Sequence, residues 1–327
     1  MADVIRWGIL GTGNIAHKFA TGLQTASGAQ LVAVGSRTQA AADKFAEEFN
    51  VPRRYATYEA LAQDPEVDAI YISTPHPFHV SNTKLCLENG KAVLCEKPFT
   101  INVKEADEVI ALARQKHIFL MEAMWTRYLP ALIRTRELIA EGAIGEVRML
   151  TADFGFRTNF NEEGRMFDPA LGGGALLDVG IYPISLAYML FGSPQTITTQ
   201  AALGTTGVDE QSAYLFGYDK GQIALLSSAS RTETPQEAFI MGTEGSIKLP
   251  SPWWNASQLI LKRASKAEEV IAPPRVGNGY NYEAEEVGRC IRAGKLESET
   301  MTLDETRAIM VTMDTIRAQW NLKYPNE

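Results

Sequence analysis

Three side chains in the sequence have the chemistry of a proton-transfer site. Lys97 lies in a Glu-Lys-Pro run that ends a short apolar stretch, and Asp178 and Tyr182 follow the glycines at 172–174. On a helix, residues four apart project from the same face, about one turn from each other. An ammonium near a tyrosine favours the phenolate and so lowers the tyrosine pKa. Lysine, aspartate and tyrosine together therefore suit general acid–base chemistry.

Each of the three also has an ordinary structural alternative. Lys97 fits a solvated lysine at a strand end, Asp178 fits a helix cap, and Tyr182 fits a ring in a core. Taken singly, the residues do not decide between these alternatives and catalysis.

The N-terminus indicates which reaction the proton transfer serves. A strand-like apolar run at residues 4–10 breaks into the sequence GTGNIA at residues 11–16. This G-x-G-x-x-A turn is typical of a dinucleotide-binding βαβ unit. Gly11 permits a tight turn, Gly13 lets the backbone approach a pyrophosphate, and the helix opening with Asn14 and Ile15 points its N–H groups at the phosphates. The proton exchange then accompanies hydride transfer to or from a nicotinamide.

The end of the second strand predicts NADP as the cofactor. The apolar run Leu31–Gly35 ends in Ser36 and Arg37, where sites that prefer NAD usually carry an acidic residue for the ribose 2′-hydroxyl. The planar guanidinium of Arg37 suits a 2′-phosphate, which a carboxylate would repel. The alternative is a solvated surface arginine.

Residues 1–122 alternate apolar strands with helical segments, which predicts a doubly wound parallel sheet. Ligands of such sheets bind beyond the carboxyl ends of the strands. That rule brings Thr74, Pro75, His76 and Glu96-Lys97 to one crevice. His76 and His79 lack an obvious third ligand and make a poor zinc site, so no metal is predicted.

The pattern changes in the second half, and we predict an α+β domain over 123–327. Its large sheet is expected to be mostly antiparallel, with one helix near Ala175–Leu190 against one face and a C-terminal helix after Thr302. The strands are expected at 147–156, 196–203, 212–216, 223–227, 239–241, 246–249 and 258–262.

Composition narrows the class of protein. The 327 residues are 45% hydrophobic and carry a net charge of −8, which argues against a nucleic-acid partner. We expect no signal peptide and no membrane span. Three scattered cysteines predict no disulfide framework and fit a cytoplasmic location.

Taken together, these motifs resemble the Gfo/Idh/MocA oxidoreductase family. The resemblance runs through residues 11–16, Ser36-Arg37, Thr74-Pro75 with His79, the Glu-Lys-Pro run and 172–182. Residues 124–130 and 167–174 are most similar to its dimeric dihydrodiol dehydrogenase branch, which includes NADP-dependent aldose dehydrogenases such as D-xylose dehydrogenases.

The resemblance implies roles for individual residues. Lys97 is the essential lysine, Tyr182 the acid or base where many members have histidine, and Asp178 a residue that orients a substrate hydroxyl. The proton carrier stays open between Tyr182 and Lys97. The implied substrate wall is Trp125, to which Phe154 and Trp254 are added although core packing fits both equally well. The expected cofactor contacts are Gly11, Gly13, Asn14, Ile15, Ser36, Arg37, Thr74, Pro75, His76, His79, Glu96 and Lys97.

The predicted activity is an NADP(H)-dependent oxidoreductase acting on a secondary alcohol or hemiacetal of a small polyhydroxylated sugar, polyol or trans-dihydrodiol. The alternatives are a non-catalytic NADP-binding sensor and a sugar–sugar oxidoreductase that keeps its NADP. The sequence does not name the substrate, the reacting carbon or the direction. We also expect at least a homodimer joined through the second domain's sheet, with Ile197, Leu225 and Ile240 as candidates for an apolar patch.

Overall fold

The computed structural model describes residues 4–325 and 327, which form two compact units. The first unit runs up to Trp125 and also contains Val276–Arg307, and the second comprises Thr126–Arg275 and Ala308–Glu327. The sequence placed the division at 122/123 with a single crossing. The structure differs because the chain returns to the first unit after the large sheet of the second.

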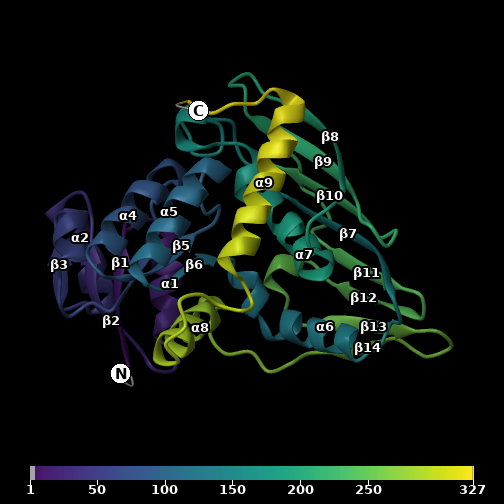
Figure 1. Ribbon diagram of the computed structural model, residues 1–327, viewed down its shortest axis with the longest axis horizontal. Helices are drawn as coiled ribbons and strands as arrows, with labels where there is room; N and C mark the ends of the chain where they lie inside the picture. The colour runs from purple at the N-terminus through teal and green to yellow at the C-terminus, as the bar shows by residue number, and fades with distance from the viewer. Residues whose placement is uncertain (1–3, 326) are drawn as a thin grey trace. The chain divides into compact units, whose positions relative to one another are not determined.

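The first unit is built on a six-stranded parallel sheet with the order β3-β2-β1-β4-β5-β6 (Figure 1). This order is that of the doubly wound dinucleotide-binding fold, as predicted. The strands are β1 (Ile5–Leu10), β2 (Ala29–Gly35), β3 (Arg53–Tyr55), β4 (Ala69–Ile72), β5 (Ala92–Glu96) and β6 (Leu120–Ala123). The helices between them are α1 (Asn14–Leu23), α2 (Gln39–Phe49), α3 (Tyr58–Ala62), α4 (His79–Glu88) and α5 (Val103–Lys116), with a short 3₁₀ turn η1 (His76–Phe78) before α4.

Three helices of this unit, α2, α3 and α5, begin at a polar side chain that caps them. The Thr38 side chain accepts a hydrogen bond from the Ala41 N–H at the start of α2, and the Asn102 side chain accepts one from the Glu105 N–H at the start of α5. Such caps satisfy backbone donors that have no partner within the helix. They fix where each helix leaves the sheet, and hence where the strand-end loops lie.

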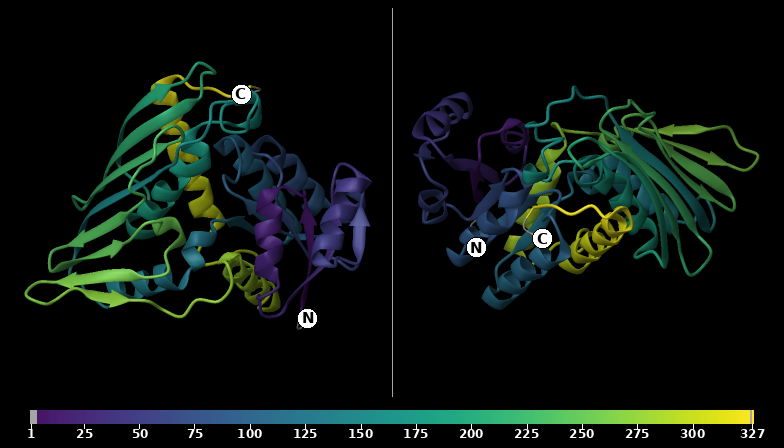
Figure 2. Two further views of the ribbon diagram at one scale, coloured as in Figure 1. Left: turned by 180° about the vertical axis from the view of Figure 1, so that it is seen from behind. Right: turned by 90° about the horizontal axis from the view of Figure 1, so that it is seen from above.

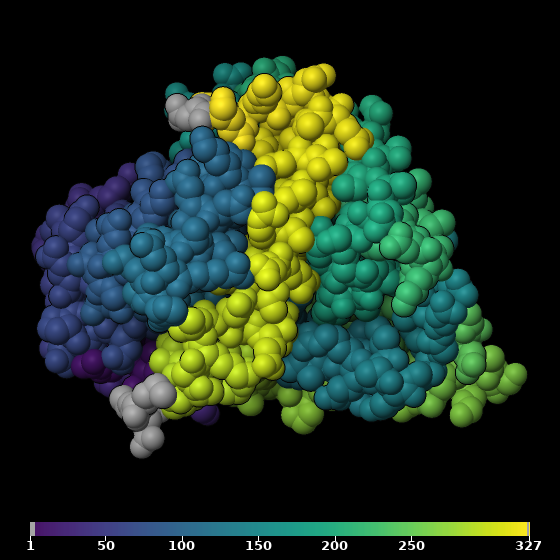
Figure 3. All heavy atoms as spheres, in the orientation of Figure 1, coloured from purple at the N-terminus to yellow at the C-terminus, as the bar shows by residue number. Residues whose placement is uncertain are grey.

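The returning segment completes the first unit. Helix α8 (Tyr280–Arg292) packs on α1, and the side-chain amide of Asn278 donates to the Lys18 carbonyl at 2.7 Å. The first turn of α9 (Leu303–Trp320) lies beside α5 (Figure 3), where Asp304 pairs with Arg114 at 2.7 Å.

The second unit is built on an eight-stranded sheet with the order β14-β13-β12-β11-β7-β10-β9-β8. All neighbouring strands are antiparallel except β7 and β10, which confirms the predicted mostly antiparallel sheet. The strands are β7 (Val147–Gly155), β8 (Thr196–Leu203), β9 (Asp209–Gly217), β10 (Ile223–Ala229), β11 (Ala238–Gly242), β12 (Gly245–Leu249), β13 (Leu259–Arg263) and β14 (Glu269–Ile271).

Helices cover one face of this sheet, and no helix of the described residues lies on the other (Figures 1 and 2). The covering elements are α6 (Pro130–Ala140), α7 (Ile181–Phe191) and the part of α9 from Ala308 onward. The strands accordingly alternate: in β9, Tyr214 and Phe216 are buried while Leu215 between them is 46% exposed. The sheet therefore builds its core on one side only.

The apolar segment Pro169–Phe191 contains the core helix of the second unit. It is long and apolar enough to cross a membrane by length and composition, contrary to the expectation that no such stretch exists, but 83% of its most apolar window is buried within the fold. An apolar helix that is buried to this extent is typical of a protein interior.

Candidate active site

The glycine turn after β1 has the shape of a phosphate cradle. Gly11 has a φ of 101°, and a Cβ at this position would lie 2.8 Å from Ser73 Oγ, so only glycine fits without displacement. A Cβ at Gly13 would meet nothing within 4 Å, which leaves open space at the start of α1. Helix α1 has no side-chain cap and no acidic residue in its first turn. The N–H groups of this first turn, at Asn14 and Ile15, fit a pyrophosphate.

At the end of β2 the side chains suit a cofactor that carries an additional phosphate. Ser36 is buried, with its hydroxyl 3.1 Å from that of Thr12 in the glycine turn. Arg37 is exposed, and within the described chain its guanidinium has no hydrogen-bond or ion-pair partner. An exposed arginine without a carboxylate partner is available to pair with a phosphate.

His79 joins two of the strand-end loops. Its side chain is fully buried, with Nδ1 2.8 Å from the Pro98 carbonyl and Nε2 2.8 Å from the Thr74 carbonyl. Burial lowers the pKa of His79, and the two carbonyl contacts oppose that shift. Because both ring nitrogens face backbone carbonyls, the histidine fixes the loops that hold Thr74 and Lys97. Its predicted cofactor contact stays a prediction, whereas His76 begins the neighbouring turn η1.

The Glu-Lys-Pro loop at the end of β5 is held by hydrogen bonds within the first unit. Glu96 is buried; it accepts a short hydrogen bond from the Tyr71 hydroxyl and another, at 3.1 Å, from the Lys97 N–H. The Phe99 N–H donates to Glu122 at 3.2 Å. Through these contacts Glu96 orients the loop. Lys97, the next residue in the loop, is half-buried.

Near Glu96 lies a buried carboxyl that the sequence analysis missed. Glu283 on α8 has no exposed surface, and within the described chain neither of its carboxyl oxygens has a hydrogen-bond partner. Burial raises the pKa of Glu283 well above its usual value, and the negative charge of Glu96 raises it further. Both effects disfavour the ionised form of Glu283 in the folded protein. Tyr280 and Val287, which lie on the buried side of the same helix, were the available sign that this polar position faces a core.

In the second unit, Asp178 and Tyr182 lie on successive turns of one helical segment. A π-helical turn η4 (Leu176–Gly180) runs directly into α7, and both side chains are only 6% exposed. Asp178 forms a two-pronged ion pair with Arg165, at 2.6 and 3.3 Å. The Arg165 side chain is 48% exposed, so the pair lies at the surface of the unit. Arg165 was not predicted, because nothing in the loop 156–168 marks one arginine as a partner of Asp178.

Two of the three residues predicted to form the substrate wall lie beside Tyr182. Phe154 and Trp254 stack with ring centroids 4.7 Å apart, and the Tyr182 ring is 5.2 Å from that of Phe154. The Trp254 indole N–H donates to Gln236 at 3.0 Å, which fixes the ring. Trp125 belongs to the first unit, is 3% exposed and stacks on Tyr280 at 4.6 Å. Its predicted contact with substrate stays a prediction.

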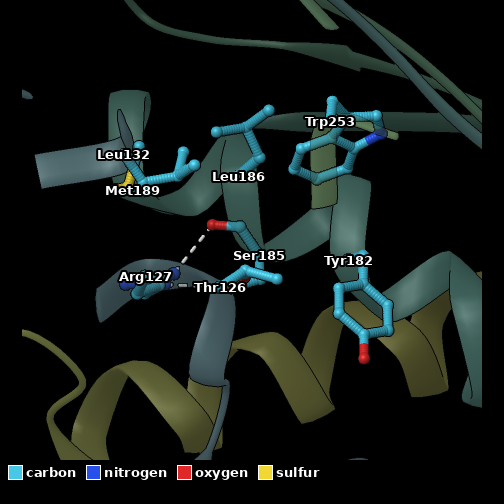
Figure 4. Close-up of a pocket in the computed structure, with 8 residues that line it drawn as sticks. All are labelled: Thr126, Arg127, Leu132, Tyr182, Ser185, Leu186, Met189 and Trp253. Atoms are coloured by element: carbon cyan, nitrogen blue, oxygen red, sulfur yellow. Dashed lines mark hydrogen bonds between the residues drawn. The ribbon is translucent and has the colours of Figure 1, made fainter. Parts of the chain in front are cut away.

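A small cavity of about 10 Å³ is bordered by Tyr182, with room for about one water molecule (Figure 4). Buried Arg127 borders it and donates to the Ser185 hydroxyl at 3.0 Å and carbonyl at 2.7 Å. In Figure 4 the Tyr182 hydroxyl points away from Trp253 and from this cavity. The cavity is therefore a packing feature behind the ring.

Comparison with known proteins places both units in one family. Residues 5–124 match the family model described as an oxidoreductase family with an NAD-binding Rossmann fold, and residues 132–248 match the GFO/IDH/MocA C-terminal domain. The chain belongs to the Gfo/Idh/MocA oxidoreductase family. The predicted family, fold class and enzyme class are thereby confirmed.

Several relatives match over the full length. The trans-1,2-dihydrobenzene-1,2-diol dehydrogenase of Danio rerio is 38% identical over 332 residues, and that of Homo sapiens is 36% identical over 332 residues; each alignment covers 99% of both chains. Among solved structures, a 3-ketoreductase from Actinomadura kijaniata in complex with NADP and TDP-benzene has a TM-score of 0.84 at 23% identity, covering 96% of this chain and 97% of that one. An aldose-aldose oxidoreductase from Caulobacter crescentus complexed with glycerol has a TM-score of 0.86 at 22% identity, with the same coverage. These two structures share the fold.

The raised pKa of Glu283 predicts how the free energy of unfolding depends on pH. Glu283 has a raised pKa in the folded state, so its contribution to stability is complete below its usual pKa and is lost as the pH rises through the folded-state value. Glu283→Gln removes this titration, and the unfolding free energy of the variant relative to wild type should rise by up to about 1.4 kcal/mol per pH unit over that window. Denaturant unfolding between about pH 5 and pH 8 measures it.

Glu47→Gln, at an exposed position on α2, is the matched control and should show no such trend. If the Glu283→Gln difference stays flat with pH, the carboxyl is ionised in the native protein and the assignment is wrong.

Proposed function

We propose that this protein is an NADP(H)-dependent dehydrogenase or reductase. It transfers a hydride between the nicotinamide and a secondary alcohol or hemiacetal carbon of a sugar, polyol or trans-dihydrodiol. The full-length identity of 36–38% to trans-dihydrobenzenediol dehydrogenases carries this proposal. The open glycine cradle and the aromatic group around Tyr182 support it from the structure.

Each unit contributes part of the chemistry. In the first, residues 11–16 hold the pyrophosphate, and Ser36 and Arg37 hold the 2′-phosphate of the cofactor, which when bound accepts or supplies the hydride. In the second, Tyr182 exchanges the proton of the substrate hydroxyl. Lys97, which belongs to the first unit, is the second candidate for the proton carrier. Asp178, held in orientation by Arg165, accepts a hydrogen bond from a neighbouring substrate hydroxyl.

Phe154 and Trp254 give the ring of the substrate an apolar surface. Stacked aromatic faces bind the C–H faces of sugars and diols without using their hydroxyls. The hydroxyls then remain for Asp178 and Tyr182, which decide the orientation of the reacting carbon.

Aldoses, inositols and trans-dihydrodiols assayed with NADP⁺ and NAD⁺ test the proposal. We expect turnover of at least one of these classes with a preference for NADP of at least about tenfold, because a charge-assisted contact to phosphate contributes ~1.5–3 kcal/mol. Arg37→Ala should raise the KM for NADP much more than that for NAD. Equal effects on the two cofactors would show that Arg37 does not read the 2′-phosphate.

The roles of Tyr182, Lys97 and Asp178 separate in steady-state kinetics. Tyr182→Phe keeps the ring that packs on Phe154 but removes the proton, so kcat should fall by ~10²–10⁴-fold while NADPH binding is retained. Lys97→Met should be at least as damaging, and Asp178→Asn should act mainly on substrate KM. If Tyr182→Phe keeps a near-normal kcat while Lys97→Met is inactive, then Lys97 is the proton carrier.

A dimer through the uncovered sheet face is also part of the proposal. Leu215 and Leu225 pair across β9 and β10 on this face and are 46% and 45% exposed. The structure corrects two of the predicted patch residues: Ile240 is fully buried, and Ile197 pairs with buried Phe216 on the helix-covered side. An apolar area on a sheet face favours a second copy as its cover.

Light scattering at micromolar protein concentration should give at least a dimer mass. Leu225→Lys should shift the protein toward monomer, because it places a charge in the centre of the face. Val311→Lys on α9, at a side chain that is 39% exposed, is the matched control and should leave the mass unchanged. A monomer mass for the wild type would remove this part of the proposal.

We also propose a cytoplasmic location, no nucleic-acid partner and no membrane attachment. The three cysteines, Cys86, Cys95 and Cys290, are buried and unpaired, which fits a reducing compartment.

A further inference from the structure

A group of buried polar side chains lies beneath the helical turn that carries Asp178. Asp209, Ser212 and Tyr214 on β9 and Ser228 on β10, here called the polar cluster, are all nearly or fully buried. The Ser212 hydroxyl lies 2.6 Å from the Tyr214 hydroxyl and 3.1 Å from both Asp209 Oδ2 and the Ser228 hydroxyl. The four side chains therefore form one connected hydrogen-bond network inside the second unit.

Asp209 anchors the start of the turn. Its Oδ2 accepts a hydrogen bond from the Leu176 N–H at 2.8 Å, one of the first-turn donors that a helix leaves without an internal partner. Its Oδ1 lies so close to Gly174 that a Cβ there would collide with it. Gly174 also has a φ of 112°, so a side chain at this position is excluded twice.

The polar cluster contacts the other end of the turn as well. A Cβ at Gly180 would lie 2.7 Å from the Tyr214 hydroxyl and 3.0 Å from that of Ser228. Glycine at both ends thus lets the backbone of residues 174–180 rest directly on the cluster. Asp178 projects from the middle of this backbone, and Tyr182 follows two residues after Gly180.

The charged and titratable groups around Asp209 come from three elements. Tyr214 belongs to its own strand, Arg317 to α9, and Tyr324 to the C-terminal segment, where the Tyr324 hydroxyl donates to the Gly173 carbonyl at 2.6 Å. Arg317 forms ion pairs with Glu327 and Asp314, and its positive charge also lowers the pKa of Asp209. Burial raises the pKa of Asp209 to about 7, so the carboxyl changes charge near neutral pH.

We propose that Asp209 is a positioning residue for the reaction, which holds the turn 174–180 on the polar cluster and so fixes Asp178 and Tyr182. The catalytic roles of Asp178 and Tyr182 rest on the proposed function; the anchoring of the turn does not. Because burial raises the pKa of Asp209 above that of an unfolded aspartate, the folded turn favours the protonated carboxyl, and the turn is held most firmly below about pH 7.

The anchoring is tested by hydrogen–deuterium exchange on the full-length protein, followed in peptides that cover residues 174–182. Asp209→Ala removes the acceptor, and exchange there should increase by at least about tenfold. Asp209→Asn keeps an amide oxygen facing Leu176 and should restore most of the protection. Asp64→Ala is the control: it removes another buried acceptor, bonded to the Glu66 N–H at 2.9 Å in the first unit, and should leave these peptides unchanged.

Unchanged exchange in Asp209→Ala would overturn the proposal. So would an equal increase in Asp64→Ala, because the effect would then be a general loss of stability. If Asp209→Ala does not fold, Asp209→Asn decides the question: wild-type protection of residues 174–182 should decrease as the pH rises through about 7, and the variant should lack that decrease. The same pH response in both proteins would overturn the proposal.

Kinetics then connect the anchor to the reaction. With any substrate that the wild type turns over, Asp209→Ala should lower kcat by at least about tenfold and leave the KM for NADP within about twofold. Asp209→Asn should lose the fall in kcat that the wild type shows as the pH rises through about 7. An unaltered kcat in Asp209→Ala would show that the reaction does not need the Asp209 anchor, and it would contradict the role of Asp209 as a positioning residue. A wild type without turnover would contradict the proposed function, while the exchange experiment would still decide the anchoring.

Discussion

Direct packing of backbone on buried polar atoms is the constraint on which the candidate site depends. At Gly11 the chain passes so close to Ser73 that no side chain fits, and at Gly174 it passes closer still to Asp209. Each approach fixes the first turn of a helix: α1 in the first unit and η4, leading into α7, in the second. A helix start that cannot shift gives the phosphate-binding N–H groups, or the Asp178 and Tyr182 side chains, a defined position.

The two units solve the problem of rigidity differently. In the first, the parallel sheet is buried on both sides and its strand-end loops are linked by His79, Glu96 and Glu122. In the second, the large sheet has helices on one face only, and a polar network between that face and η4 takes the place of a second layer. Buried polar groups that are joined by hydrogen bonds are costly to rearrange, which makes them suitable supports for a reactive group.

Features that depend on local sequence were predicted well. Asn102 and Thr302 are each followed three residues later by a Glu, the pattern of a capping box, and each accepts the hydrogen bond from the Glu105 or Glu305 N–H that such a motif requires. The strand Thr196–Leu203 was predicted with the bounds that the structure gives. Local rules worked here because the partner groups lie within a few residues of each other.

Features that depend on distant partners were missed. Helix α8 was not predicted from the sequence, because Asn281 and Glu283 occupy buried positions and interrupt its apolar pattern. Arg165 pairs with Asp178 across an irregular loop. Asp209, on a strand 33 residues further along the chain, accepts a hydrogen bond from the Leu176 N–H. No periodicity connects such residues, so only the folded chain brings them together.

Deuterium tracing tests the central claim, direct hydride transfer to NADP, most directly. An aldose deuterated at C1, or a trans-dihydrodiol deuterated at its CH–OH carbons, is incubated with NADP⁺ and the protein, and the NADPH formed is analysed by mass spectrometry and NMR. The account predicts that the label appears on C4 of the nicotinamide ring, on one face only, with no loss to water. NADPH formed without the label, or label released into solvent, would contradict it.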